Sequence, residues 1–86
     1  MASHFTVIVN VGARKADGLM MKQQLRDVFS SKGVEADIQL GRGGTEIVEL
    51  ARRAAKGESR VVVAAGGDGT VNTVASELVG TGKILG

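Results

Sequence analysis

The chain has 86 residues, which is enough for one small domain. It contains no cysteine and one histidine, so disulfides, thiolate metal sites and a histidine-based zinc site are excluded. A net charge of +2, with two Phe and no Trp or Tyr, gives little attraction for a phosphate backbone and little surface for base stacking. We therefore expect no nucleic-acid partner.

The first predicted element is a strand over residues 5–11, which is rich in β-branched side chains. Its uninterrupted apolar centre favours an interior position in a sheet. Asn10 lies at its end, followed by a polar loop over residues 12–18 that contains Arg14. In open α/β sheets, ligands bind at this carboxyl end of the strands.

A helix and a second strand are predicted next. The helix covers residues 19–32, with Met21, Leu25, Val28 and Phe29 on its buried stripe and the methionines as core filler. Residues 34–40 alternate apolar and polar side chains, which predicts a half-exposed strand at the edge of the sheet.

A second helix is predicted after the glycine-rich loop at residues 41–44, with Thr45 as its N-cap. The side chains expected to face the sheet are Ile47, Leu50, Ala51, Ala54 and Ala55.

The central stretch of the chain combines a strand, a turn and a helix. Residues 61–65 are all apolar, which predicts a parallel strand buried on both faces. A turn of sequence GGDGTVN follows over residues 66–72 and leads into a third helix, whose expected end is Gly80 as a left-handed C-cap. The predicted apolar stripe of this helix consists of Val71, Val74, Ala75, Leu78 and Val79.

The turn has a functional and a structural interpretation. A tight strand–turn–helix directs backbone N–H groups and the positive end of the helix dipole at one spot, which suits a phosphate. Alternatively, the glycines only let the helix fold back on the sheet. Asp68 would repel a phosphate directly, so it would instead hold Mg²⁺, a hydroxyl or a basic side chain nearby. Its structural alternative is an Asx turn or the helix N-cap.

Residues 66–72 resemble the GGDGT-x-N signature of the diacylglycerol kinase catalytic domain, a family that includes bacterial lipid kinases and sphingosine and ceramide kinases. More distantly, the turn resembles those of NAD kinases and 6-phosphofructokinases. The resemblance implies that Asp68 is the catalytic residue, either organising Mg²⁺ and phosphates or polarising the acceptor hydroxyl. It also implies that ATP is bound by Gly66, Gly67, Asp68, Gly69, Thr70, Val71 and Asn72.

Two further segments are similar to the family. Thr45 matches a family Thr that contacts the nucleotide, although helix capping alone would explain it. Asn10 matches the first residue of the family's N-P-x-[SA]-G pattern, but Val11 stands where Pro is usual. The resemblance implies nucleotide contacts from Asn10 to Arg14, with a solvated surface charge as the alternative for Arg14.

The expected fold is α/β, a three-layer α/β/α arrangement with a mostly parallel sheet of strand order 2-1-3-4. It would be similar to the N-terminal domain of NAD kinases and phosphofructokinases. A short fourth strand is expected at residues 83–85. Since the resemblance covers only the first part of the family's domain, residues 1–86 are expected to form a single partial nucleotide-binding domain, truncated before the family's second, β-rich domain.

The expected function is the ATP-binding portion of a lipid kinase that uses ATP and Mg²⁺. No stretch approaches the length of a transmembrane span and the N-terminus lacks a signal-peptide core, so a cytoplasmic location is expected. By resemblance, the full-length protein would act on a lipid substrate at the membrane surface, while this chain alone would be inactive. One alternative is an NAD-kinase-like or other small-molecule kinase domain. Another is a non-catalytic truncated α/β module that forms a homo-oligomer through the exposed sheet edge at the fourth strand.

Overall fold

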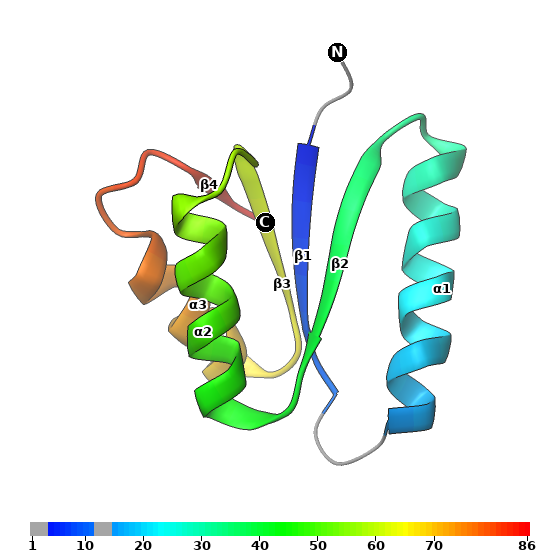
Figure 1. The fold of residues 1–86 in the computed structure, drawn as a ribbon, viewed down its shortest axis with the longest axis horizontal. Helices are drawn as coiled ribbons and strands as arrows, with labels where there is room; N and C mark the ends of the chain where they lie inside the picture. Colours follow the sequence, from blue (N-terminus) through cyan, green and yellow to red (C-terminus); the bar gives the residue numbers. More distant parts are fainter. Residues whose placement is uncertain (1–3, 12–14) are drawn as a thin grey trace.

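The computed structural model describes residues 4–11 and 15–86. Its four strands are all parallel and lie in the order β2-β1-β3-β4 (Figure 1). No helix in this described part is long and apolar enough to cross a membrane. In chain order, the elements are β1 (His4–Asn10), α1 (Lys15–Ser31), β2 (Glu35–Gly41), α2 (Gly43–Lys56), β3 (Val61–Ala65), α3 (Asp68–Leu78) and β4 (Ile84–Leu85).

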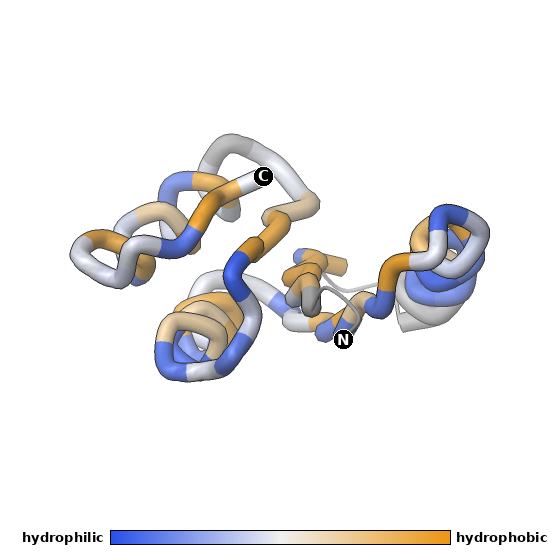
Figure 2. The backbone as a smooth tube through the Cα atoms, turned by 90° about the horizontal axis from the view of Figure 1, so that it is seen from above, coloured by the Kyte–Doolittle hydropathy of each residue, from blue (hydrophilic) through white to orange (hydrophobic). Residues whose placement is uncertain are grey.

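The helices cover the two faces of the sheet and produce three layers. Figure 2 shows the apolar strands between α1 on one side and the pair α2 and α3 on the other. The α2/α3 face holds the larger core, formed by Ile8, Ile47, Ala51, Ala54, Val62, Val74 and Leu78. On the opposite face, Leu25 and Phe29 of α1 pack against Val7, Val9 and Ile38. The predicted fold class and strand order are confirmed.

Helix α1 differs most from its prediction. It begins at Lys15 rather than at residue 19. Met20 and Met21 are 64% and 42% exposed, so the prediction that the methionines fill the core was wrong. Val28 is also exposed. The reason is that α1 packs mainly against the edge strand β2, which leaves room for only a narrow buried stripe.

Burial is also narrower than predicted on β3 and α3. Val62 is fully buried but Val63 is only partly so, because α1 packs mainly against β2 and leaves this face of β3 less covered. On α3, Val79 is 81% exposed because the helix ends at Leu78. Val74 and Leu78 of the predicted stripe are buried, whereas Val71 is exposed, and Thr70 continues the buried line at a spacing of four residues.

Candidate functional site

The carboxyl ends of the three long strands meet at one edge of the sheet, the lower edge in Figure 1. Both α2 and α3 begin there, each directly after its strand. The first N–H groups of a helix have no intrahelical acceptor, and the helix dipole adds partial positive charge to them. This edge therefore presents two sets of N–H donors to one region.

A hollow of ≈ 340 Å³ lies between the two helix N-termini. This volume falls within the range of small-molecule pockets, roughly 300–1,000 Å³. The residues that line the hollow come from the end of β1, from the turn after β3 and from the first two turns of α2 and α3. They are Asn10, Gly44, Ile47, Gly67, Gly69, Thr70 and Thr73.

Three of these lining residues are glycines with open space in front of them. A Cβ atom added to Gly44, Gly67 or Gly69 would meet no atom within 4 Å, and none of the three has a left-handed φ. Neither backbone conformation nor internal crowding therefore requires glycine at these positions. The open space leaves room for a ligand to approach the backbone closely at these positions.

The start of α3 is built by Gly66 and Gly67. Gly67 is the N-cap, and its carbonyl oxygen accepts hydrogen bonds from Thr70 N–H at 3.0 Å and Val71 N–H at 3.2 Å. The preceding N–H groups, those of Asp68 and Gly69, are thus the ones without an acceptor in the helix. These donors suit an anion in the adjacent hollow.

Asp68 is the first residue of α3, so the sequence alternative that made it the N-cap was wrong. Its side chain is not among those that the structure describes. A carboxylate at this position is favoured by the helix dipole whether or not a ligand is bound. Arg14, the other charged residue predicted for the site, lies outside the described residues.

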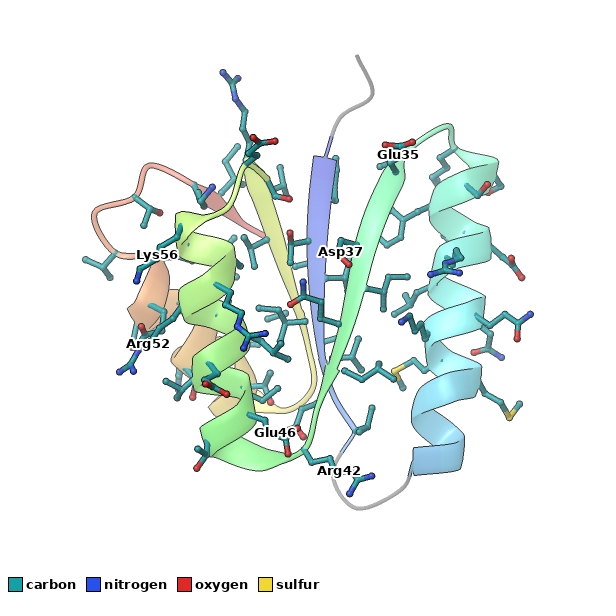
Figure 3. The ribbon with its side chains drawn as sticks, in the orientation of Figure 1. Glu35, Asp37, Arg42, Glu46, Arg52 and Lys56 are labelled. Atoms are coloured by element: carbon teal, nitrogen blue, oxygen red, sulfur yellow. The ribbon has the colours of Figure 1, made fainter. Side chains whose placement is uncertain are left out.

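The prediction that Thr45 caps α2 was also wrong. The helix begins at Gly43 with Arg42 as the N-cap, and Arg42 N–H donates to Glu46 Oε1 at 3.3 Å. Figure 3 shows Arg42 and Glu46 together at this end of α2. Thr45 lies in the first turn with its side chain exposed. Capping therefore no longer explains Thr45, and its nucleotide contact stays a prediction.

Asn10 joins the two helices. Its Nδ2–H donates to Thr70 Oγ1 at 3.1 Å, and its Oδ1 accepts from Gly43 N–H at 3.3 Å. Thr70 is buried beside the turn, whereas Val71 and Asn72 are exposed and do not line the hollow. Of the predicted site residues, the structure thus brings Asn10, Gly67, Gly69 and Thr70 together around the hollow.

Three lining residues were missed from the sequence: Gly44, Ile47 and Thr73. Ile47 follows Gly44 by three positions on α2, and Thr73 follows Thr70 by three on α3, so each pair shares a helix face. Thr70 was a predicted site residue, so its spacing could have indicated Thr73, whereas Gly44 was itself missed and gave no lead to Ile47. Thr73 Oγ1 donates to Gly69 O at 2.8 Å, which strengthens the first turn of α3.

Among the side chains that the structure describes, no group of three or more His, Asp or Glu could hold a metal ion. Magnesium beside phosphates commonly uses only one or two protein carboxylates, with the phosphates completing its coordination. The described part of the site is thus equipped for an anion through backbone donors.

The model of the diacylglycerol kinase catalytic domain matches residues 4–86 of the chain. The chain belongs to this family. The match confirms the resemblance carried by the turn at residues 66–72. A family of this lipid-kinase type consists of transferases of lipid metabolism, and its kinase chemistry indicates ATP use. A search among curated proteins returned no match.

Proposed function

We propose that this chain binds ATP at the junction of α2 and α3, as the nucleotide-holding part of a lipid kinase of the diacylglycerol kinase type. The observation that carries this proposal is the hollow between the N-termini of α2 and α3. Three of its lining residues are glycines with no other atom near the position of a Cβ. A polyphosphate is a ligand that two sets of backbone N–H donors suit, because each set can hold one phosphate group.

The proposed roles follow from position. Backbone N–H groups of Gly44, Asp68 and Gly69 hold phosphates, and the exposed Thr45 hydroxyl contacts the nucleotide. Ile47 supplies an apolar wall to the hollow. The wider set of proposed contacts, taken from the family resemblance, also includes Gly66, Val71, Asn72 and Arg14.

Asp68 is the proposed catalytic residue. Phosphoryl transfer requires the γ-phosphate to be held, its charge to be offset and an acceptor hydroxyl to be placed in line. At the start of α3, the Asp68 carboxylate either organises Mg²⁺ beside the phosphates or polarises the acceptor hydroxyl. The proposed acceptor is a lipid at the cytoplasmic surface of a membrane, with these 86 residues alone binding ATP without transferring its phosphate.

The test is an amide NMR titration of the chain with ATP, with and without Mg²⁺. We expect the largest shifts at residues 66–72, with smaller ones at Gly44 and Thr45. If these amides stay still at millimolar ATP while the fold is intact, the proposal fails.

Asp68→Asn separates the two roles of the carboxylate. Loss of the Mg²⁺-dependent part of binding would assign Asp68 to the metal, whereas unchanged binding would assign it to the acceptor. Glu58→Gln is the matched control, because Glu58 is an exposed acid in the loop at the opposite edge of the sheet.

A second proposal is self-association through β4. This strand has two residues, lies at the end of the sheet and carries Ile84, which is 63% exposed. An apolar free edge favours pairing with a second copy. Light scattering over a wide concentration range should show a dimer that Ile84→Glu abolishes and Val79→Glu, on an exposed apolar residue outside the strand, does not. A monomer at every concentration would contradict it.

A further inference from the structure

Asn10 lies where it can reach both helices that bound the hollow. It ends β1, which is paired with β2 on one side and with β3 on the other. In the sheet register, Asn10 is opposite Gly41, directly before the turn into α2, and Val9 is opposite Ala65, directly before the turn into α3. One side chain at this point therefore touches two turns that are distant in sequence.

Within the described part of the chain, the amide group of Asn10 is hydrogen-bonded to both helices. It donates from Nδ2 to Thr70 Oγ1 in the first turn of α3 and accepts at Oδ1 from the backbone N–H of Gly43, the first residue of α2. An amide carries both a donor and an acceptor, so it can serve a hydroxyl oxygen and an N–H at once without adding charge. A neutral group is also compatible with an anion in the hollow.

Neither helix is held at this end by its own N-cap side chain. Arg42 and Gly67 make no side-chain cap hydrogen bond. The bond from Gly43 N–H to Asn10 satisfies one of the orphan donors of α2 from outside the helix. On the other side, Thr70 is only 5% exposed and lies close to Gly66, so Asn10 bonds to a buried hydroxyl group.

We propose that Asn10 is a positioning residue, which sets the separation of the α2 and α3 N-termini and thereby pre-forms the hollow. It acts through Gly43 and Thr70. The inference rests on the proposed function for its consequence, ATP affinity, but its structural part is testable without any nucleotide. A group that pre-organises two donor sets spares a ligand the cost of ordering them.

The first experiment follows amide hydrogen exchange in the absence of nucleotide. Asn10→Ala should speed exchange of the Gly43 amide about tenfold, the loss expected for one hydrogen bond, and shift the Thr70 and Gly69 resonances. The Val11 amide, which donates to Gly41 O at 3.0 Å, should stay protected because β1 and β2 remain paired. Asn10→Asp should restore Gly43 protection, since a carboxylate oxygen accepts the same bond and Thr70 O–H can turn to donate.

The second experiment measures the Mg²⁺-ATP dissociation constant by the same titration. Asn10→Ala should weaken binding about tenfold, and Asn10→Asp should weaken it as well because a negative charge now lies beside the phosphates. Thr6→Val is the matched control, because it removes a buried hydrogen bond from the same strand but at the other end of the sheet. This control should leave both Gly43 exchange and ATP affinity unchanged.

The outcomes are distinguishable. Unchanged exchange at Gly43 and unchanged shifts at Thr70 in Asn10→Ala would overturn the positioning role. Faster exchange at Gly43 with unchanged ATP affinity would also overturn it, since the separation of the α2 and α3 N-termini would then have no effect on ATP binding. If the unmodified chain does not bind ATP, the proposed function fails, and the exchange experiment alone decides whether Asn10 sets the separation of the helices.

Discussion

A Cβ atom on Gly66 would lie 2.7 Å from Thr70 Oγ1, closer than such atoms approach in folded proteins. The same atom would lie 3.2 Å from Asn10 Cβ. Gly66 also has a φ of 156°, which L side chains rarely adopt. The first glycine of the turn is therefore required by packing and by backbone conformation, in contrast to the glycines that face the hollow.

We predict that Gly66→Ala lowers the free energy of unfolding by about 2–4 kcal/mol, from backbone strain plus overpacking against Thr70. Urea denaturation followed by circular dichroism measures it. Gly82→Ala is the matched control, because Gly82 also has a left-handed φ of 75° but has open space around it. The control should lose only the strain, about 1 kcal/mol. Equal losses in the two variants would contradict the crowding at Thr70.

Gly69→Ala should have opposite effects on stability and on binding. Gly69 lies in the first turn of α3, and a Cβ atom added to it would meet nothing within 4 Å, so alanine should stabilise the helix by up to about 1 kcal/mol. The new methyl group would project where a ligand approaches the backbone, so ATP affinity should fall. Thermal unfolding and the ATP titration measure the two quantities. A variant that is more stable and binds ATP as before would contradict close approach at this residue.

The overall fold was predictable because its signals are local and agree with one another. The alternation at residues 34–40 placed β2 at the edge, and the GGDGTVN turn located the start of α3 to within a residue or two. Capping was less predictable. Thr45 is a good N-cap residue by type, yet Arg42 is the N-cap of α2. The side chain of Glu46 accepts a hydrogen bond from Arg42 N–H, and the side chain of Asn10 accepts one from Gly43 N–H.

The hollow itself was only partly predictable, because its walls depend on how two helices meet. Nothing in the sequence near Ile47 or Thr73 indicates that α2 and α3 converge. The exposure of Met20 and Met21 was unpredictable for the same reason. The apolar stripe of a helix shows which side faces the sheet, but the packing of α1 against the edge strand β2 decides how many residues of that side are buried.

The ammonium group of Lys83 ties the end of the chain to the loop after α2. Lys83 Nζ donates to Gly57 O at 2.8 Å and to Ser59 O, next to the backbone bond from Ile84 N–H to Arg60 O. We predict that Lys83→Met lowers the free energy of unfolding by about 1–2 kcal/mol, since charge-assisted bonds to two carbonyls are lost. Hydrogen exchange at Ile84 should accelerate. Lys56→Met, on an exposed lysine of α2, is the control and should cost less. An equal loss would contradict a special role for Lys83.

Thr6 and Ser59 form a buried hydroxyl pair at the amino end of the strands, with Thr6 Oγ1 donating to Ser59 Oγ at 2.7 Å. Both residues are less than 10% exposed, at 5% and 7%, so water cannot readily replace a lost partner. Thr6→Val keeps the side-chain shape but leaves the Ser59 hydroxyl without its donor, and should cost about 1–2 kcal/mol of unfolding free energy. Adding Ser59→Ala removes the hydroxyl that Thr6→Val leaves without a partner. The double variant should therefore lose less unfolding free energy than the sum of the losses in the two single variants. Additive losses in urea denaturation would show that the two hydroxyls do not stabilise the fold through each other.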